Sequence, residues 1–260
     1  MKEKLTIVKV GGAVVEDEAQ LARLLKDFAA IEGHKILVHG GGRRATKVAG
    51  RLGIESRMVD GRRITDAKML EVVTMVYGGL VNKSLVARLQ ACGINALGLT
   101  GADMNAVQSH KRPLKNGIDF GFVGDVDHVN GYALQLLLQQ GITPVIAPLT
   151  HDGQGNILNT NADTMASEVA KALSRFFNVT LIYCFEKPGV LRNPADEASL
   201  IPVITREEFS GYVADGTVSG GMIPKLENAL AAVDHGVSKV IITLATAIDG
   251  KHGTVIQRRK

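Results

Sequence analysis

Tryptophan is absent from this chain of 260 residues, and aromatic residues make up only 4% of it. The formal net charge of +4 is mildly basic, but lysines and arginines are scattered apart from the short tail at residues 258–260. Proteins that bind nucleic acids more often combine a basic stripe with stacking aromatic side chains. The composition therefore predicts a protein that does not bind nucleic acid.

Cysteine is also scarce, since Cys92 and Cys184 are the only two. They lie far apart in apolar surroundings, which predicts buried free thiols rather than a disulfide. Residues 2–4 lead directly into an apolar strand without a signal peptide, and no apolar run approaches the ~20 residues that span a bilayer. Together these features predict a cytoplasmic protein that has no membrane partner.

A P-loop is missing as well. The nearest Lys-Ser pair, Lys83-Ser84, follows Asn82 rather than a glycine, and the surrounding periodicity is helical. Any nucleotide must therefore be held by a different device.

Apolar strand-like runs alternate with helically spaced apolar residues along most of the chain, which is typical of a parallel sheet covered by helices. We predict an α/β fold, a three-layer α/β/α sandwich around a central, mainly parallel sheet. A boundary near residues 175–178 divides it into an N-terminal lobe, residues 1–176, and a C-terminal lobe, residues 177–260. The short linker implies that both lobes share one sheet. The predicted strands are residues 5–8, 35–38, 94–100, 143–147, 179–184 and 239–244.

Local signals predict turns and helix starts. Asp60-Gly61 and Asp152-Gly153 are typical of hairpin turns. Thr65 is the predicted N-cap of a long helix, and residues 205–208 match a capping box.

Two glycine turns follow the first two predicted strands. Lys9 precedes Gly11-Gly12, and His39 precedes residues 40–42, which are all glycine. Glycine lets backbone N–H groups approach an anion, and the helix that follows adds the positive end of its dipole. Because parallel strands end at the same edge of a sheet, both turns should face one site. This pattern indicates that a phosphate is transferred there.

The second turn has an alternative interpretation. Gly40, Gly42 and Ala45 match a loose dinucleotide fingerprint, with Asp60 near the place of a ribose-binding acid. However, Asp60 lies in a predicted hairpin, and the motif follows the second strand rather than the first. We therefore expect His39 to be a packed or hydrogen-bonded turn residue.

Further polar groups lie at two predicted helix starts and one hairpin. Asn159, Asn161 and Asp163 are more than one cap requires, so an acid here could align lysines. Lys225 lies in a first helical turn, where the dipole disfavours a cation unless an anion is bound nearby. Arg62 and Arg63 point to opposite faces of a strand, so only one can meet a ligand. Each of these residues could alternatively be a simple cap or a solvated charge.

Taken together, these segments resemble the amino acid kinase family and, within it, the acylglutamate kinase branch. The resemblance implies ATP-dependent phosphorylation of the γ-carboxylate of an N-acyl-L-glutamate, with an acetyl or a larger acyl group such as succinyl, in arginine biosynthesis. It also implies that the N-terminal lobe binds the acylglutamate and the C-terminal lobe binds ATP. The matching segments are residues 8–12, 39–42, 60–65, 81–83, 98–101, 121–126, 159–163 and 220–225.

Roles for single residues follow from the same resemblance. Lys9 and Lys225 would neutralise the transferring phosphoryl group, and Asp163 would hold both lysines. Mg²⁺ would be carried mainly by the ATP phosphates, with no metal ligand assigned to the chain. The phosphate-binding turn residues would be Gly11, Gly12 and Gly41, and the substrate-binding residues would be Gly41, Gly42, Arg63 and Asn159.

The chain also differs from the family pattern. Residues 185–189 read Phe-Glu-Lys-Pro-Gly where relatives usually have Thr or Ser, then Asp-Val, before the glycine. The stretch between Thr243 and Gly253 is shorter than the helical insertion of relatives. A helical N-terminal arm that makes arginine-inhibited members hexameric is not seen, so we expect a homodimer without arginine feedback. Alternative functions are a kinase for carbamate, aspartate or a nucleoside monophosphate, and a non-catalytic ligand-binding regulator.

Overall fold

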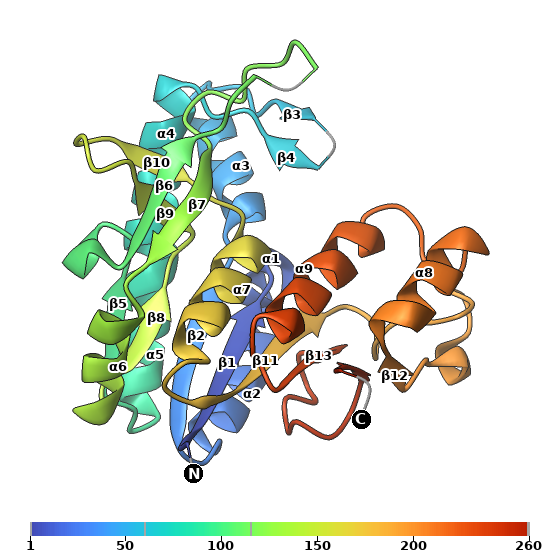
Figure 1. Cartoon of the computed structure of the whole chain (residues 1–260). Coiled ribbons are helices and arrows are strands. Elements are labelled where there is room, and N and C mark those ends of the chain that lie inside the picture. The colour runs from blue at the N-terminus through green and yellow to red at the C-terminus, as the bar shows by residue number, and fades with distance from the viewer. Residues whose placement is uncertain (1, 60, 115, 259–260) are drawn as a thin grey trace.

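A central sheet of eight strands runs through the computed structural model, which describes residues 2–59, 61–114 and 116–258 (Figure 1). Its strand order is β12-β14-β13-β11-β1-β2-β8-β5. Neighbouring strands from β13 to β5 pair in parallel, and β14 runs antiparallel to β13. The bounds are β1 Lys4–Val10, β2 His34–His39, β5 Ala96–Leu99, β8 Thr143–Ile146, β11 Asn178–Phe185, β12 Val203–Ile204, β13 Lys239–Leu244 and β14 Thr254–Ile256.

Helices cover both faces of this sheet, so the predicted three-layer α/β/α sandwich is confirmed. Alternation along β1 places Ile7 in one apolar cluster with α6, α7 and α9, and Val8 in another with α2, α3, α4 and α5. The helix bounds are α1 Gly12–Glu16, α2 Glu18–Ala29, α3 Gly42–Arg51, α4 Ala67–Val73, α5 Asn82–Ala91, α6 Gly131–Gln139, α7 Ala162–Leu173, α8 Arg206–Ala214 and α9 Met222–Asp234, with short helices at η2 Asp103–Asn105 and η3 Glu197–Ser199.

The two predicted lobes share the sheet through the parallel pair β1 and β11. Helix α7 ends at Leu173 and β11 begins at Asn178, so the connection is as short as the sequence predicted. All six predicted strands are present, within a few residues of their predicted ends.

A second sheet of four strands was not predicted, apart from one of its hairpins. Its strand order is β10-β9-β6-β7, and the predicted turn at Asp152-Gly153 joins β9 to β10. The small ribbon of β3 Met58–Val59 and β4 Arg62–Arg63 confirms the other predicted hairpin, although Asp60 itself lies outside the described residues. The bounds of the second sheet are β6 Val107–Lys111, β7 Gly124–Val129, β9 Leu149–His151 and β10 Ile157–Asn159.

Helix starts were predicted with mixed success. The capping box is confirmed, because Thr205 and Glu208 satisfy each other's backbone N–H at the start of α8. The prediction that Thr65 caps α4 is wrong by one residue. The carboxylate of Asp66 accepts the Met69 N–H at 2.9 Å, while the Thr65 hydroxyl accepts a bond from Asn159.

One continuous helix runs from Ala67 to Ala91 through α4, the π-helical segment η1 Thr74–Val81 and α5. Among the described residues it is long and apolar enough, by length and composition, to cross a membrane, whereas the sequence analysis found no such run. Inside the protein, 44% of its most apolar window is buried, and Met69, Val73 and Leu85 belong to the core. Core helices pass the same test, and this helix packs one side against the core.

The cysteine prediction is confirmed for one residue only. Both thiols are free, and Cys184 on β11 is buried, where burial raises its pKa to about 12. Cys92 is exposed, because it lies just beyond the last turn of α5 and its apolar neighbours face the other way.

Helix α6 offers a direct test of where the core lies. Leu134 is 1% exposed and Leu136 is 40% exposed. We expect Leu134→Ala to lower the free energy of unfolding by about 2–5 kcal/mol, because it leaves a cavity. Leu136→Ala, two residues along the same helix, should change it by no more than ~0.5 kcal/mol. Urea unfolding followed by circular dichroism measures both, and equal losses would contradict this assignment of the core.

Candidate functional site

The two glycine turns face one another, as the sequence predicted. Val10 and His39 are register partners at the ends of β1 and β2, and the Gly40 N–H donates to the Val10 carbonyl at 3.0 Å. A Cβ on Gly12 would lie within 3.7–3.8 Å of the backbone nitrogens of Gly41 and Gly42. The turns therefore form two walls of one narrow space at the carboxyl edge of the sheet.

Glycine at position 41 is required by a close neighbour. A Cβ there would lie 2.7 Å from the ring of Tyr77, which reaches the turn from the π-helical segment. Within the described residues, the N–H groups of Gly12, Gly41 and Gly42 donate to no backbone or side-chain acceptor. Because each lies at or beside a helix N-terminus, these donors are available to an anion.

Lys9 forms an ion pair with Asp163, and their nearest atoms are 2.7 Å apart. Both side chains are mostly buried, with 12% and 17% exposed. Asn161 is the true N-cap of α7, because its side chain accepts the N–H groups of Asp163 and Thr164. The Asp163 carboxylate is therefore free of capping and is available to hold the lysine.

Lys225 lies in the first turn of α9 and approaches the same pair. Burial lowers the pKa of Lys225, the positive charge of Lys9 lowers it further, and the negative charge of Asp163 opposes both. Its ammonium lies 3.8 Å from the centroid of the Phe185 ring. Phe185, which appeared as a departure from the family pattern, thus provides a cation–π contact for Lys225. Of the two lysines, only Lys9 forms an ion pair with the Asp163 carboxylate in the described part of the chain.

Arg63 is the arginine of the predicted pair that turns inward, and only 8% of it is exposed. Its guanidinium donates to the Gly42 carbonyl and to Thr46 Oγ1, each at 2.9 Å, and to Ser56 Oγ at 2.9 Å. Arg62 on the other side of the strand is exposed. The planar guanidinium thus ties the β3–β4 ribbon to the second glycine turn.

Asn159 lies at the end of β10, where its side-chain amide donates to Thr65 Oγ1 at 2.9 Å. It also lines a cavity of about 190 Å³ beside the glycine turns. All four predicted substrate-binding residues, Gly41, Gly42, Arg63 and Asn159, lie in the wall of this cavity.

Sequence reasoning missed Arg112, which also lines the cavity from just beyond β6. Its guanidinium contacts the Asp125 carboxylate at 2.5 Å and lies over the Phe120 ring at 5.5 Å. Hydrogen bonding from Arg112 lowers the pKa of Asp125. Asp125 belongs to a segment that matched the family, but only the unpredicted second sheet brings Arg112 there.

His39 is fully buried and hydrogen-bonded, as predicted, and is not exposed to the cavity as a base would be. Burial lowers its pKa to about 4. The ribose-binding role considered for Asp60 falls outside the described residues.

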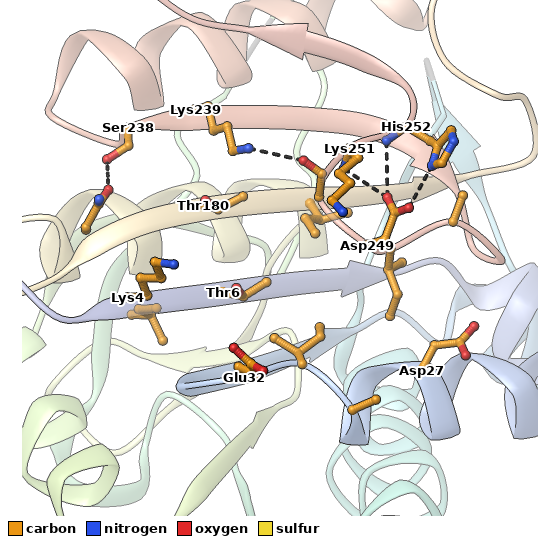
Figure 2. A pocket seen from close by; sticks show the side chains of 18 of the residues that line it. Lys4, Thr6, Asp27, Glu32, Thr180, Ser238, Lys239, Asp249, Lys251 and His252 are labelled. Carbon is orange, nitrogen blue, oxygen red and sulfur yellow. Dashed lines mark hydrogen bonds and ion pairs between the residues drawn. The ribbon is translucent and has the colours of Figure 1, made fainter.

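A larger cavity of about 1180 Å³ lies toward the other ends of β1, β11 and β13 and contains none of the predicted site residues (Figure 2). Its lining includes Thr6 and Thr180 on the sheet and residues 246–252, which follow β13. Acidic and basic groups are mixed here, among them Lys239, Asp249 and Lys251. The predicted substrate-binding residues line the smaller cavity instead.

Comparison with known proteins places this geometry in a family. The sequence model of the Amino acid kinase family matches residues 4–244. The chain is similar to an acetylglutamate kinase of Bacteroides thetaiotaomicron, with 66% identity over 258 residues, covering 99% of this chain and 100% of the relative.

Solved structures share the fold at low sequence identity. An N-acetylglutamate synthase from Neisseria gonorrhoeae, in complex with coenzyme A and N-acetyl-glutamate, gives a TM-score of 0.83 at 20% identity over 98% of this chain and 60% of that chain. A Giardia carbamate kinase gives 0.71 at 16% identity over 98% and 99% of the two chains. With a family match that spans most of its length, this chain belongs to the amino acid kinase family.

Proposed function

We propose that this chain transfers the γ-phosphoryl group of ATP to the side-chain carboxylate of N-acetyl-L-glutamate, a step of arginine biosynthesis. The observation that carries the proposal is the pair of facing glycine turns beside the Lys9–Asp163 ion pair. The 66% identity to an acetylglutamate kinase over nearly the whole chain supports the same substrate.

The chemistry of this reaction suits the residues present. A carboxylate is already a nucleophile at neutral pH, so the transfer needs no strong general base. The main obstacle is the repulsion between the carboxylate and the phosphoryl group, which are both anionic. Fixed cations and backbone N–H donors lower this electrostatic barrier, and they do so most in a site that excludes water.

Each charged residue then has a role in the transfer. Lys9 and Lys225 stabilise charge on the transferring oxygens, and Asp163 keeps Lys9 in place. The N–H groups of Gly12 and Gly41 donate to the phosphoryl group from opposite sides. This assignment is supported by the 2.7 Å contact of Lys9 with Asp163 and by the free N–H groups of both turns.

The remaining cavity residues would bind the amino acid. Arg63 places a fixed positive charge beside the substrate carboxylate while its terminal nitrogens stay bonded to protein oxygens, and Asn159 can bond the acyl amide. Arg112 adds a third polar group to the same wall. Whether an acyl group larger than acetyl also fits is decided by assaying N-succinyl-glutamate beside N-acetyl-glutamate.

ATP would bind to the C-terminal lobe, residues 177–260, and the acylglutamate to residues 1–176. The substrate cavity supports this division, because residues 40–162 supply its whole lining. Mg²⁺ would arrive bound to the phosphate oxygens of ATP, which are the hard ligands that this ion prefers. The described residues contain no cluster of three or more His, Cys, Asp or Glu suited to a metal, and we assign none to it.

The alternative functions fit less well. Identity to the Giardia carbamate kinase is 16%, far below the 66% to an acetylglutamate kinase. A non-catalytic regulator would have no need for Lys9, Asp163 and Lys225 to converge on the glycine turns.

The proposed activity can be assayed directly. Purified protein with ATP, Mg²⁺ and N-acetyl-L-glutamate should yield an acyl phosphate, which hydroxylamine traps as a coloured hydroxamate. Carbamate and aspartate should give no comparable product. A protein that forms no hydroxamate from either N-acetyl- or N-succinyl-glutamate would contradict the proposed function.

The role of Lys225 can be tested by removing its charge. Because its charge acts on the transition state, Lys225→Ala should lower kcat by ~10²–10³ with little change in KM for either substrate. Lys251→Ala is the matched control, since Lys251 is an exposed lysine in the larger cavity. Steady-state kinetics measures both variants, and an unchanged kcat for Lys225→Ala would remove its assigned role.

We propose that the chain assembles as a homodimer in the cytoplasm. Met75 and Leu80 on the long helix are 55% and 49% exposed, and Leu97 on the edge strand β5 is 38% exposed. A contiguous patch of exposed apolar side chains often marks an interface, and we propose that these three residues contribute to one. Sedimentation velocity at micromolar concentration should show a dimer that Leu80→Lys weakens, and a monomeric wild type would refute the proposal.

A further inference from the structure

A buried chain of hydrogen bonds runs behind the second glycine turn and has no role in the proposed reaction so far. Asn82 is 1% exposed and His39 is 0% exposed. The Asn82 amide nitrogen lies 3.1 Å from His39 Nε2 and donates to the Val145 carbonyl at 2.9 Å. His39 Nδ1 lies 3.0 Å from the carbonyl oxygen of Gly40. The chain therefore leads from a core helix to the first residue of the turn.

The partners fix the proton positions in this chain. The carbonyl of Gly40 can only accept, so the proton of the neutral imidazole lies on Nδ1 and Nε2 is an acceptor. The carbonyl of Val145 can also only accept, so the Asn82 amide nitrogen faces it and donates its second hydrogen to Nε2. Asn82 thereby selects the tautomer in which the ring donates to Gly40.

Asn82 is itself held firmly against three neighbouring strands. It begins α5 directly after the π-helical segment and contacts β2 through His39 and β8 through Val145. Its side-chain oxygen lies where a side chain of residue 98 on β5 would begin, since a Cβ on Gly98 would be 1.9 Å from that oxygen. That oxygen is buried and has no hydrogen-bond partner among the described residues. Burying this oxygen without a partner costs free energy of folding. This cost indicates that the two N–H donors of the Asn82 amide are needed.

The planarity of the peptide bond carries the effect to the site. The Gly40 carbonyl and the Gly41 N–H belong to one trans peptide unit, so they point in opposite directions. Because the His39 ring holds the Gly40 carbonyl, it also sets the direction of the Gly41 N–H. The Gly40 N–H is fixed independently by the Val10 carbonyl at 3.0 Å. The two hydrogen bonds therefore hold the peptide units on either side of Gly40, where glycine has no Cβ to restrict rotation.

We propose that His39 and Asn82 are positioning residues that, through the Gly40–Gly41 peptide, aim the Gly41 N–H at the transferring phosphoryl group. The inference rests on the proposed kinase function and assigns neither residue a contact with substrate. It predicts that disturbing the chain lowers kcat and leaves substrate binding nearly intact, because a misdirected donor is missed mainly in the transition state.

Two substitutions of His39 separate aiming from packing. Asn places an amide N–H at the position of Nδ1 and can still donate to Gly40, whereas Gln places its amide near Nε2 and cannot. We expect His39→Gln to lower kcat about ten-fold, less than outright loss of a donor, with little change in either KM. His39→Asn should retain most of the wild-type kcat, although both variants lose thermal stability.

Asn82→Ala should lower kcat like His39→Gln, because the ring is then free to change tautomer. Lys83→Met is the matched control. Lys83 follows Asn82 in α5, and its ammonium donates to the Gly98 carbonyl of β5 at 2.9 Å rather than to His39. If Asn82→Ala does not fold, the two His39 variants still decide. Equal kcat losses in both His39 variants, or none in either, would overturn the proposal. A wild type that phosphorylates no acylglutamate would instead refute the proposed function.

Discussion

The parallel register of β1 and β2 is the constraint on which the site depends. It places Val10 beside His39, so both strands end together and both glycine turns open at one edge of the sheet. The bond from the Gly40 N–H to the Val10 carbonyl extends that register into the turns. A shift by one residue would move every side chain of one strand to the apolar cluster on the opposite face of the sheet and separate the turns. Core packing and site geometry are thus specified by the same alternation.

Charge balance is the second requirement, because the proposed reaction brings two anions together. The structure places Lys9 and Lys225 on this edge from opposite halves of the chain, and their mutual repulsion must be offset while no ligand is bound. Asp163 offsets it by pairing with Lys9, and the Phe185 ring partly solvates Lys225. Binding of a phosphate would therefore strengthen an arrangement that the protein already holds in place.

Much of the fold was predictable because strong local signals agreed with it. Each of the six predicted strands is an apolar run, and the glycine turns mark strand ends by their own chemistry. Lys9, Asp163 and Arg63 could be found for the same reason, since each adjoins a turn or a helix start.

The features that were missed depend on contacts that sequence patterns do not encode. The strands β6 and β7 are partly exposed and carry charges, so the second sheet and the placement of Arg112 gave no clear periodic signal. The helix is capped by Asp66 rather than Thr65, and the Thr65 hydroxyl is bonded to a residue distant in the sequence, Asn159. The link from Asn82 to His39 joins residues 43 positions apart and exists only after the sheet has formed.

The central claim is that both glycine turns contact one transferring phosphoryl group. The most direct measurement is a crystal structure with ADP, N-acetyl-L-glutamate and aluminium fluoride, which mimics the phosphoryl group in the transition state. We predict that the fluoroaluminate lies between the turns, within about 2.7–3.1 Å of the Gly12 and Gly41 nitrogens, and beside the ammonium groups of Lys9 and Lys225. A fluoroaluminate that is bound elsewhere, or that contacts one turn and not the other, would contradict this account.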